Sequence, residues 1–232
     1  MKEIKTLAVW GDSLMKGVIY DDQLCKYHTS DHPPMDVVAE HFPQLTIRNN
    51  SRFGNVIGKG QALIEKAAAS GRLPDAAIVE FGGNDCDFNW QEVSKGYLCD
   101  HSPNTPLDIF KKTLKDIVTL LRENGVYTIL MNLPPISAEK YFDWFCLDEE
   151  TEPEKVLHWL KEKQIIYRTQ EMYSHTIDIT AKELSVPLLD IRTEMLKIRD
   201  YDNYLCTDGI HPDIKGQQII ARSIVTQLEA YL

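Results

Sequence analysis

Short apolar segments alternate with longer segments whose apolar residues recur at helical spacing. The short segments are 6–10, 45–48, 76–81, 126–131 and 186–191, of which 45–48 is the most polar. A short apolar run bounded by turn residues is typical of a strand covered on both faces. The pattern therefore predicts five buried strands.

The longer segments predict helices with one apolar face each. They cover 57–69, 107–121, about 154–184 with room for one break, and 214–228. Strands that alternate with helices favour a parallel sheet covered by helices on both sides. We expect one three-layer α/β/α domain over residues 1–232 with a five-stranded parallel sheet, because no repeat or linker divides the chain.

Two segments, 86–106 and 134–152, do not follow this alternation and are rich in aromatic and acidic residues. Both begin just after the carboxyl end of a predicted strand, the edge at which open parallel sheets bind ligands. They are candidate pocket walls, and Trp90, Tyr97 and Trp144, with Arg52 from another loop, are candidate substrate-binding residues. Alternatively, these aromatic side chains anchor the two loops to the body of the protein.

The charge balance narrows the class of partner. The chain has 232 residues, with 25 Lys and Arg against 35 Asp and Glu, a formal net charge of −10. This balance argues against nucleic-acid binding and against stable association with anionic membranes, since both require clustered cations. An uncharged or cationic small-molecule substrate fits it better, and the sequence does not indicate an oligomeric state.

Cysteine usage and apolar run lengths bear on location and metals. The five cysteines include no Cys-x-x-Cys pair, so neither a disulfide framework nor a zinc site is indicated. No apolar run approaches the length of a membrane span, and residues 7–10 are too short for a signal-peptide core. We therefore expect free thiols, no metal and a cytoplasmic location.

Ser13 and His211 are candidates for nucleophilic catalysis. Ser13 follows the first predicted strand, and a serine hydroxyl needs an adjacent base to act as a nucleophile. His211 lies three residues after Asp208, a spacing at which a carboxylate can hold one ring nitrogen while the other acts as a base. Taken singly, each motif is more often structural, as a helix cap or a surface histidine.

Two further loops after predicted strands contain glycine and asparagine. Gly82-Gly83-Asn84-Asp85 follows the third strand, and the Asn84 amide could donate a hydrogen bond to a developing oxyanion. Gly54, in the loop after the second strand, could donate a backbone N–H to the same oxyanion. Each loop read alone is also an ordinary turn.

Together these four segments resemble the motif blocks of the GDSL-type hydrolases, the SGNH hydrolase superfamily. Gly11-Asp12-Ser13-Leu14, Gly54, Gly82-Gly83-Asn84-Asp85 and Asp208-Gly209-Ile210-His211-Pro212 appear in the family's order across nearly the whole chain. Chance agreement at all four blocks is improbable. The chain also lacks the Gly-x-Ser-x-Gly motif of the α/β-hydrolases.

The resemblance implies a flavodoxin-like fold and hydrolysis of esters or thioesters without a metal or organic cofactor. It implies Ser13 as nucleophile, His211 as base and Asp208 as its orienting residue. It also implies an oxyanion hole formed by the Ser13 and Gly54 N–H groups and the Asn84 side chain. The preferred substrate is a short acyl ester, such as an acetylated carbohydrate. The alternatives are a lysophospholipase or thioesterase, an acyltransferase, and a non-catalytic sugar-binding protein.

Overall fold

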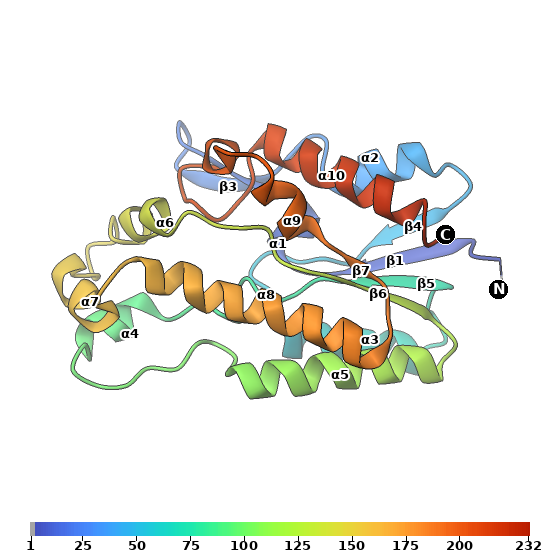
Figure 1. Cartoon of the computed structure of the whole chain (residues 1–232), viewed down its shortest axis with the longest axis horizontal. Coiled ribbons are helices and arrows are strands. Elements are labelled where there is room, and N and C mark those ends of the chain that lie inside the picture. Colours follow the sequence, from blue (N-terminus) through green and yellow to red (C-terminus); the bar gives the residue numbers. More distant parts are fainter. Residues whose placement is uncertain (1–2) are drawn as a thin grey trace.

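The computed structural model describes residues 3–232 and contains a central parallel sheet between two layers of helices (Figure 1). The sheet strands are β1 (Thr6–Trp10), β4 (Thr46–Asn49), β5 (Ala76–Val79), β6 (Tyr127–Met131) and β7 (Leu188–Leu189). Their order across the sheet is β4-β1-β5-β6-β7, and every pair is parallel. This is the flavodoxin-like order, which reverses between β1 and β5.

The two faces of the sheet bury separate hydrophobic clusters. One face is covered by α3 (Ile57–Ala69), α5 (Leu107–Glu123) and α8 (Gln164–Leu184). The other is covered by α1 (Ser13–Lys16), α2 (Pro34–His41), α9 (Ile191–Leu196) and α10 (Ile214–Leu228). Because both faces are buried, β1 and β5 are nearly continuous apolar runs.

The two predicted insertions contain helices of their own. The segment 86–106 contains α4 (Trp90–Lys95), and 134–152 contains α6 (Ala138–Phe145). Together with α7 (Pro153–Leu160) and the start of α8 they bury a third cluster, which includes Trp90, Tyr141 and Phe145. In Figure 1 these helices lie at the left end of the molecule, away from both chain termini.

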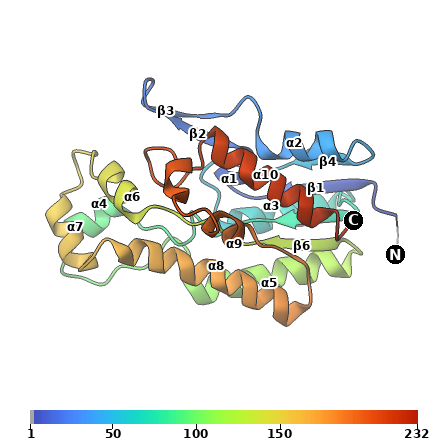
Figure 2. The same ribbon diagram turned by 45° about the horizontal axis from the view of Figure 1, so that its top comes forward.

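A second, two-stranded sheet was not predicted from the sequence. It pairs β2 (Val18–Asp21) with β3 (Lys26–Thr29) in an antiparallel hairpin, which extends over the top of the molecule in Figure 2. The hairpin side chains are mostly half-buried or exposed. Its sequence therefore does not show the apolar alternation that predicts a strand. A short 3₁₀ helix, Tyr201–Tyr204, precedes the loop that leads to α10.

Several expected boundaries differ in the structure. The long helix expected over 154–184 is divided into α7 and α8, and Lys161 ends α7 with a positive φ of 69°. The last strand, expected over 186–191, shrinks to the two residues of β7. It ends there because the Asp190 side chain accepts the Thr193 N–H and begins α9. No helix among residues 3–232 is long and apolar enough to cross a membrane.

Gly60 allows α3 to approach the end of β5. A Cβ added at Gly60 would lie 2.2 Å from Cζ of Phe81, which is fully buried, whereas a Cβ at Gly58 would meet no atom within 4 Å. Gly60→Ala should therefore lower the free energy of unfolding by about 1–3 kcal/mol through overpacking. Gly58→Ala, in the same helix, should raise it by up to about 1 kcal/mol through helix propensity. Urea unfolding of both variants checks this, and equal stabilisation by both would contradict the close approach.

Candidate active site

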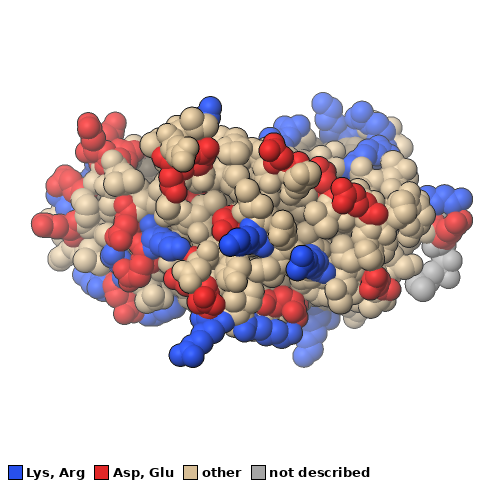
Figure 3. All heavy atoms as spheres, turned by 90° about the horizontal axis from the view of Figure 1, so that it is seen from above, with Lys and Arg blue, Asp and Glu red and all other residues tan. Residues whose placement is uncertain are grey.

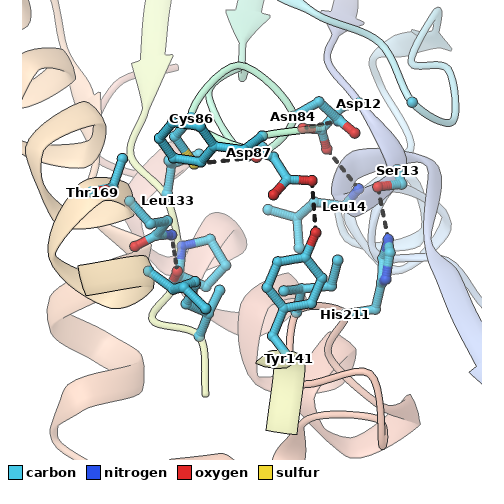
Figure 4. Close-up of a pocket in the computed structure, with 18 of the residues that line it drawn as sticks. Asp12, Ser13, Leu14, Asn84, Cys86, Asp87, Leu133, Tyr141, Thr169 and His211 are labelled. Carbon is cyan, nitrogen blue, oxygen red and sulfur yellow. Dashed lines mark hydrogen bonds between the residues drawn. The ribbon is translucent and has the colours of Figure 1, made fainter. Parts of the chain in front are cut away.

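The end of β1 and the start of α1 present Ser13 at the point where the strand order reverses. Asp12 caps α1, with its carboxylate accepting the Leu14 N–H at 2.9 Å. Ser13 is the first residue of the helix, so its N–H has no partner within the helix. The chain thus leaves the sheet through a short capped turn that places the Ser13 hydroxyl in a cavity (Figure 4).

Ser13, His211 and Asp208 form an unbroken run of hydrogen bonds. Nε2 of His211 lies 2.8 Å from Oγ of Ser13, and Nδ1 of His211 lies 2.6 Å from Oδ2 of Asp208 (Figure 4 draws the first of these). All three residues are buried. Because an aspartate can only accept, Nδ1 carries the proton and Nε2 accepts from the serine hydroxyl.

Asp208 is held as an ion by its hydrogen bonds. Burial acts to raise the pKa of Asp208, but the His211 ring and the N–H groups of His211 and Ile210 outweigh burial and lower it. Asp208 has no exposed surface. Its carboxylate therefore stabilises a proton on the imidazole when the ring accepts one.

The loop that carries His211 is braced against the second insertion. Gly209 has φ of 73°, and a Cβ there would lie 2.7 Å from the Ser137 oxygen and the Tyr141 nitrogen. The Gly209 carbonyl accepts the Ser137 N–H at 2.8 Å. The left-handed conformation and the close packing both require glycine at this position.

The two other oxyanion candidates border the same cavity. Gly54 has φ of 65° and lines the cavity, and no hydrogen bond from its N–H is found among residues 3–232. The Asn84 amide donates to Oδ2 of Asp12 at 3.0 Å and to the Asn55 carbonyl at 3.3 Å. Asn84 can donate to a substrate oxygen only when the longer of these bonds is given up.

A pair of buried carboxyl groups lies beneath Ser13. Oε2 of Glu80 accepts the Asp12 N–H at 3.2 Å, and Oε1 is buried without a donor. Burial and the neighbouring Asp12 raise the pKa of Glu80 well above its ordinary value. Burial likewise raises the pKa of Asp12, although the hydrogen bonds from Leu14 and Asn84 oppose this. Protonation of Glu80, which its raised pKa favours, removes the like-charge repulsion between the two carboxyl groups.

The β2–β3 hairpin covers the histidine. The rings of Tyr27 and His211 have centroids 5.1 Å apart, and Phe53 is stacked at 6.3 Å from His211. Tyr27 also contacts Trp144 of α6 at 5.9 Å. The hairpin and the second insertion, far apart in sequence, thus meet over the reactive groups and restrict access to them.

A cavity of about 270 Å³ opens beside Ser13 and His211. Trp90 and Trp144, two of the predicted substrate-binding residues, line it. Tyr97 does not, since its ring packs against His158. Arg52 does not either, because it is exposed and borders a separate depression beside Arg48. The structure thus brings Trp90 and Trp144 to the cavity and places Tyr97 and Arg52 away from it.

Four residues at this cavity, namely Tyr27, Glu80, Asp87 and Tyr141, were not predicted from the sequence. A charged residue at position 80, inside an otherwise apolar run, was a signal that could have identified Glu80. The other three lie in segments without regular patterning, and only the fold brings them to the cavity. Among residues 3–232 no group of three or more His, Cys, Asp and Glu side chains has the arrangement of a metal site.

Residues 9–219 match the GDSL-like Lipase/Acylhydrolase family. The chain belongs to this family. Two Arabidopsis thaliana proteins, each named a GDSL esterase/lipase, are similar to this GDSL-like protein. One is 24% identical over 165 residues (68% of this chain and 60% of the relative), and the other is 26% identical over 161 residues (66% and 53%). The chain thus spans little more than half the length of these relatives.

Solved structures share the fold of this GDSL-like protein. The lipase/acylhydrolase from Enterococcus faecalis superposes with a TM-score of 0.70 at 16% identity, covering 99% of this chain and 97% of that one. A catalytic mutant of an acetylxylan esterase from Geobacillus stearothermophilus has a TM-score of 0.65 at 21% identity, covering 98% and 96%. At these identities the likeness establishes the architecture.

The buried carboxyl groups make a pH dependence of stability testable. Burial raises the pKa of Asp85 from 3.8 to about 6, although hydrogen bonds, including one from the Ile57 N–H, oppose this. Between about pH 4 and pH 6, Asp85 therefore binds more protons in the folded protein than in the unfolded chain. Its contribution to the free energy of unfolding falls as pH rises through this window. The free energy of unfolding of Asp85→Asn should fall less steeply over this window. Asp116→Asn, at a half-exposed position on α5, is the control, and identical slopes in all three proteins would contradict the assignment.

Proposed function

We propose that the protein is a serine ester hydrolase in which Ser13 is the nucleophile, His211 the general base and Asp208 the residue that orients His211. The continuous hydrogen bonds from Asp208 through His211 to Ser13 carry this proposal. A binding protein on the same fold would not need a base held against a buried serine. The family to which the chain belongs, named for lipases and acylhydrolases, supports the same reaction class.

In the proposed reaction the Ser13 hydroxyl transfers its proton to Nε2 of His211 while Oγ attacks the ester carbonyl carbon. The resulting imidazolium is stabilised by Asp208 and returns the proton to the departing alcohol oxygen. Water then attacks the acyl-serine ester, again with His211 as base, and releases the carboxylic acid and Ser13. No cofactor is needed for this sequence of steps.

The proposed oxyanion hole comprises the N–H groups of Ser13 and Gly54 and the Asn84 amide. The two backbone groups come from loops after different strands, and the positive φ of Gly54 sets the direction of its N–H. Asn84 completes the set when its bond to Asn55 is exchanged for one to the substrate oxygen. Such donors stabilise the negative charge that develops in the tetrahedral intermediate.

For the substrate we propose a short acyl ester of a small molecule. The aromatic side chains of the hairpin and the insertions enclose the cavity and limit the space beside Ser13. Removal of acetyl groups from carbohydrate is one such reaction. One of the proteins with a similar solved structure is an acetylxylan esterase. Hydrolysis of longer acyl chains and transfer to an acceptor hydroxyl are the alternatives at the same site.

Substitutions at the site test the division of roles. Ser13→Ala should reduce turnover to near background, and Asp208→Asn should lower kcat by about 10⁴-fold through the wrong histidine tautomer. Asn84→Ala should cost about 10²–10³-fold, since other oxyanion donors remain. His211→Ala combined with Ser13→Ala should be hardly worse than Ser13→Ala alone.

Steady-state rates on a p-nitrophenyl ester provide the measurement, with circular dichroism to confirm folding. Ser70→Ala, at the end of α3, is the matched control and should retain full activity. A folded Ser13→Ala protein as active as the wild type would refute the proposed mechanism.

Acyl-chain selectivity tests the proposed substrate. With p-nitrophenyl esters from acetate to decanoate, kcat/KM should be highest for the short chains because the enclosed cavity excludes the longer ones. A binding site for long chains would instead gain about 0.8 kcal/mol for each buried CH₂. Equal or better turnover of acyl chains of about eight carbons or more would favour a lysophospholipase or thioesterase. Product analysis with an added sugar acceptor separates hydrolysis from acyl transfer.

A further inference from the structure

The cavity beside Ser13 has an unusual balance of charged groups. Apart from the Asp208–His211 pair, the titratable carboxyl groups at the cavity are Asp12, Glu80 and Asp87, and no Lys or Arg is among the described residues that line it. Asp12 and Glu80 are linked to each other beneath Ser13. Asp87 is separate from that pair and has no role in the proposed hydrolysis.

Asp87 is held between two neutral donors. Its Oδ2 accepts the Tyr141 hydroxyl at 2.6 Å, and its Oδ1 accepts Nε1 of Trp90 at 3.0 Å (Figure 4 shows Asp87 beside Tyr141). Each carboxylate oxygen can accept more than one hydrogen bond. Burial raises the pKa of Asp87 to about 6 against these bonds, so the group is mainly ionised above neutral pH. Within residues 3–232 no Lys, Arg or His forms an ion pair with it, which leaves a partly buried negative charge at the cavity.

Two other polar side chains of the cavity wall already form hydrogen bonds within the protein. The Gln170 amide donates to the Pro134 carbonyl, and its oxygen accepts from Arg192. The Cys86 thiol donates to the Gly83 carbonyl. The Thr169 hydroxyl and the Trp144 indole N–H remain as donors at the wall, and Asp87 is its partly buried carboxylate without an ion-pair partner among residues 3–232. A positively charged group needs only the carboxylate and a surrounding surface that does not itself bind the carboxylate.

Aromatic rings form that surface. The rings that line the cavity are those of Tyr27, Phe53, Phe88, Trp90, Tyr141 and Trp144. Aromatic faces attract cations, most strongly substituted ammonium groups that are weakly hydrated. A carboxylate among aromatic rings thus combines the two interactions that recognise such a cation.

The outer surface near this end of the molecule has the same sign of charge. Residues 139–154, which include most of α6, contain seven Asp and Glu and a single Lys, and four of these acidic residues pair with Lys95, Lys155 or Lys163, so a smaller excess of negative charge remains. Figure 3 shows Asp and Glu side chains interspersed with Lys and Arg at the left end, where Figure 1 places α6 and α7. A surface field of this sign raises the local concentration of a cationic substrate and slows the approach of an anionic one.

We propose that the natural substrate is an ester carrying a substituted ammonium group, which lies against the Asp87 carboxylate and the aromatic rings while Ser13 attacks the ester. This inference rests on the proposed esterase function and adds the chemical class of the substrate. Asp87 acts as a specificity-determining residue, and the reacting carbonyl remains at Ser13.

Two pairs of isosteric esters test the inference with the whole protein at about pH 8, which lies above the pKa of Asp87. Acetylcholine and 3,3-dimethylbutyl acetate place the cation or its neutral replacement on the alcohol. The p-nitrophenyl esters of 4-(trimethylammonio)butanoate and 5,5-dimethylhexanoate place it on the acyl group. In at least one pair the cationic ester should have roughly tenfold or higher kcat/KM.

Variants at Asp87 assign that preference to the carboxylate. Asp87→Asn keeps the size of the side chain and an acceptor oxygen but removes the charge, so the ratio of kcat/KM for the cationic ester to kcat/KM for its neutral partner should fall to about one. Asp87→Glu should restore part of the preference, because it restores the charge. Asp143→Asn removes one exposed carboxylate from α6 and should leave the preference unchanged.

The outcomes separate the two proposals. Equal rates within both pairs, or faster hydrolysis of the neutral members, would overturn the cation site while Ser13-dependent hydrolysis stands. A cation preference that persists in Asp87→Asn would also overturn the role of this residue. If none of the four esters is hydrolysed, or if Ser13→Ala hydrolyses them like the wild type, the esterase function itself fails.

Discussion

The Asp12 carboxylate joins the two loops on which the candidate site depends. One oxygen accepts the Leu14 N–H and so begins the helix that presents Ser13, and the other accepts the Asn84 amide. The end of β1 is thereby tied to the end of β5, its neighbour in the sheet. Glu80 supports Asp12 from below through its own buried carboxyl group. Without this link, the two loops would place Ser13 and Asn84 independently of each other.

Burying several carboxyl groups at one edge of the sheet has a thermodynamic cost. Burial raises the pKa of Asp12, Glu80 and Asp85, which means that the folded protein disfavours their charged forms. Asp208 is the exception, because the His211 ring and two backbone N–H groups keep its pKa low. The same edge thus holds carboxyl groups whose charged form is disfavoured by burial and, in Asp208, one whose charged form is favoured by its hydrogen bonds. Their environments, rather than their residue types, separate these roles.

The segments around the cavity are less regular than the sheet beneath them. The β2–β3 hairpin, the two insertions and the loop before α10 come from four parts of the chain and meet through Tyr27, Trp144 and Gly209. In this arrangement the ends of β1 and β5 place Ser13 and Asn84, the loop before α10 places His211, and the hairpin and the two insertions form the cavity walls. A common architecture can in this way accept different esters when the walls change.

Local patterns in the sequence determined the layered architecture and the four motif blocks with Ser13, Gly54, Asn84 and His211. Buried parallel strands and amphipathic helices leave periodic signals, and glycine, asparagine and histidine are readable beside turns. Only the tertiary structure decided that His211 reaches Ser13 from 198 positions away, that Asp87 meets Tyr141, and that Arg52 and Tyr97 lie outside the cavity. Loop side chains are directed by contacts with distant segments, and those contacts have no periodicity along the chain.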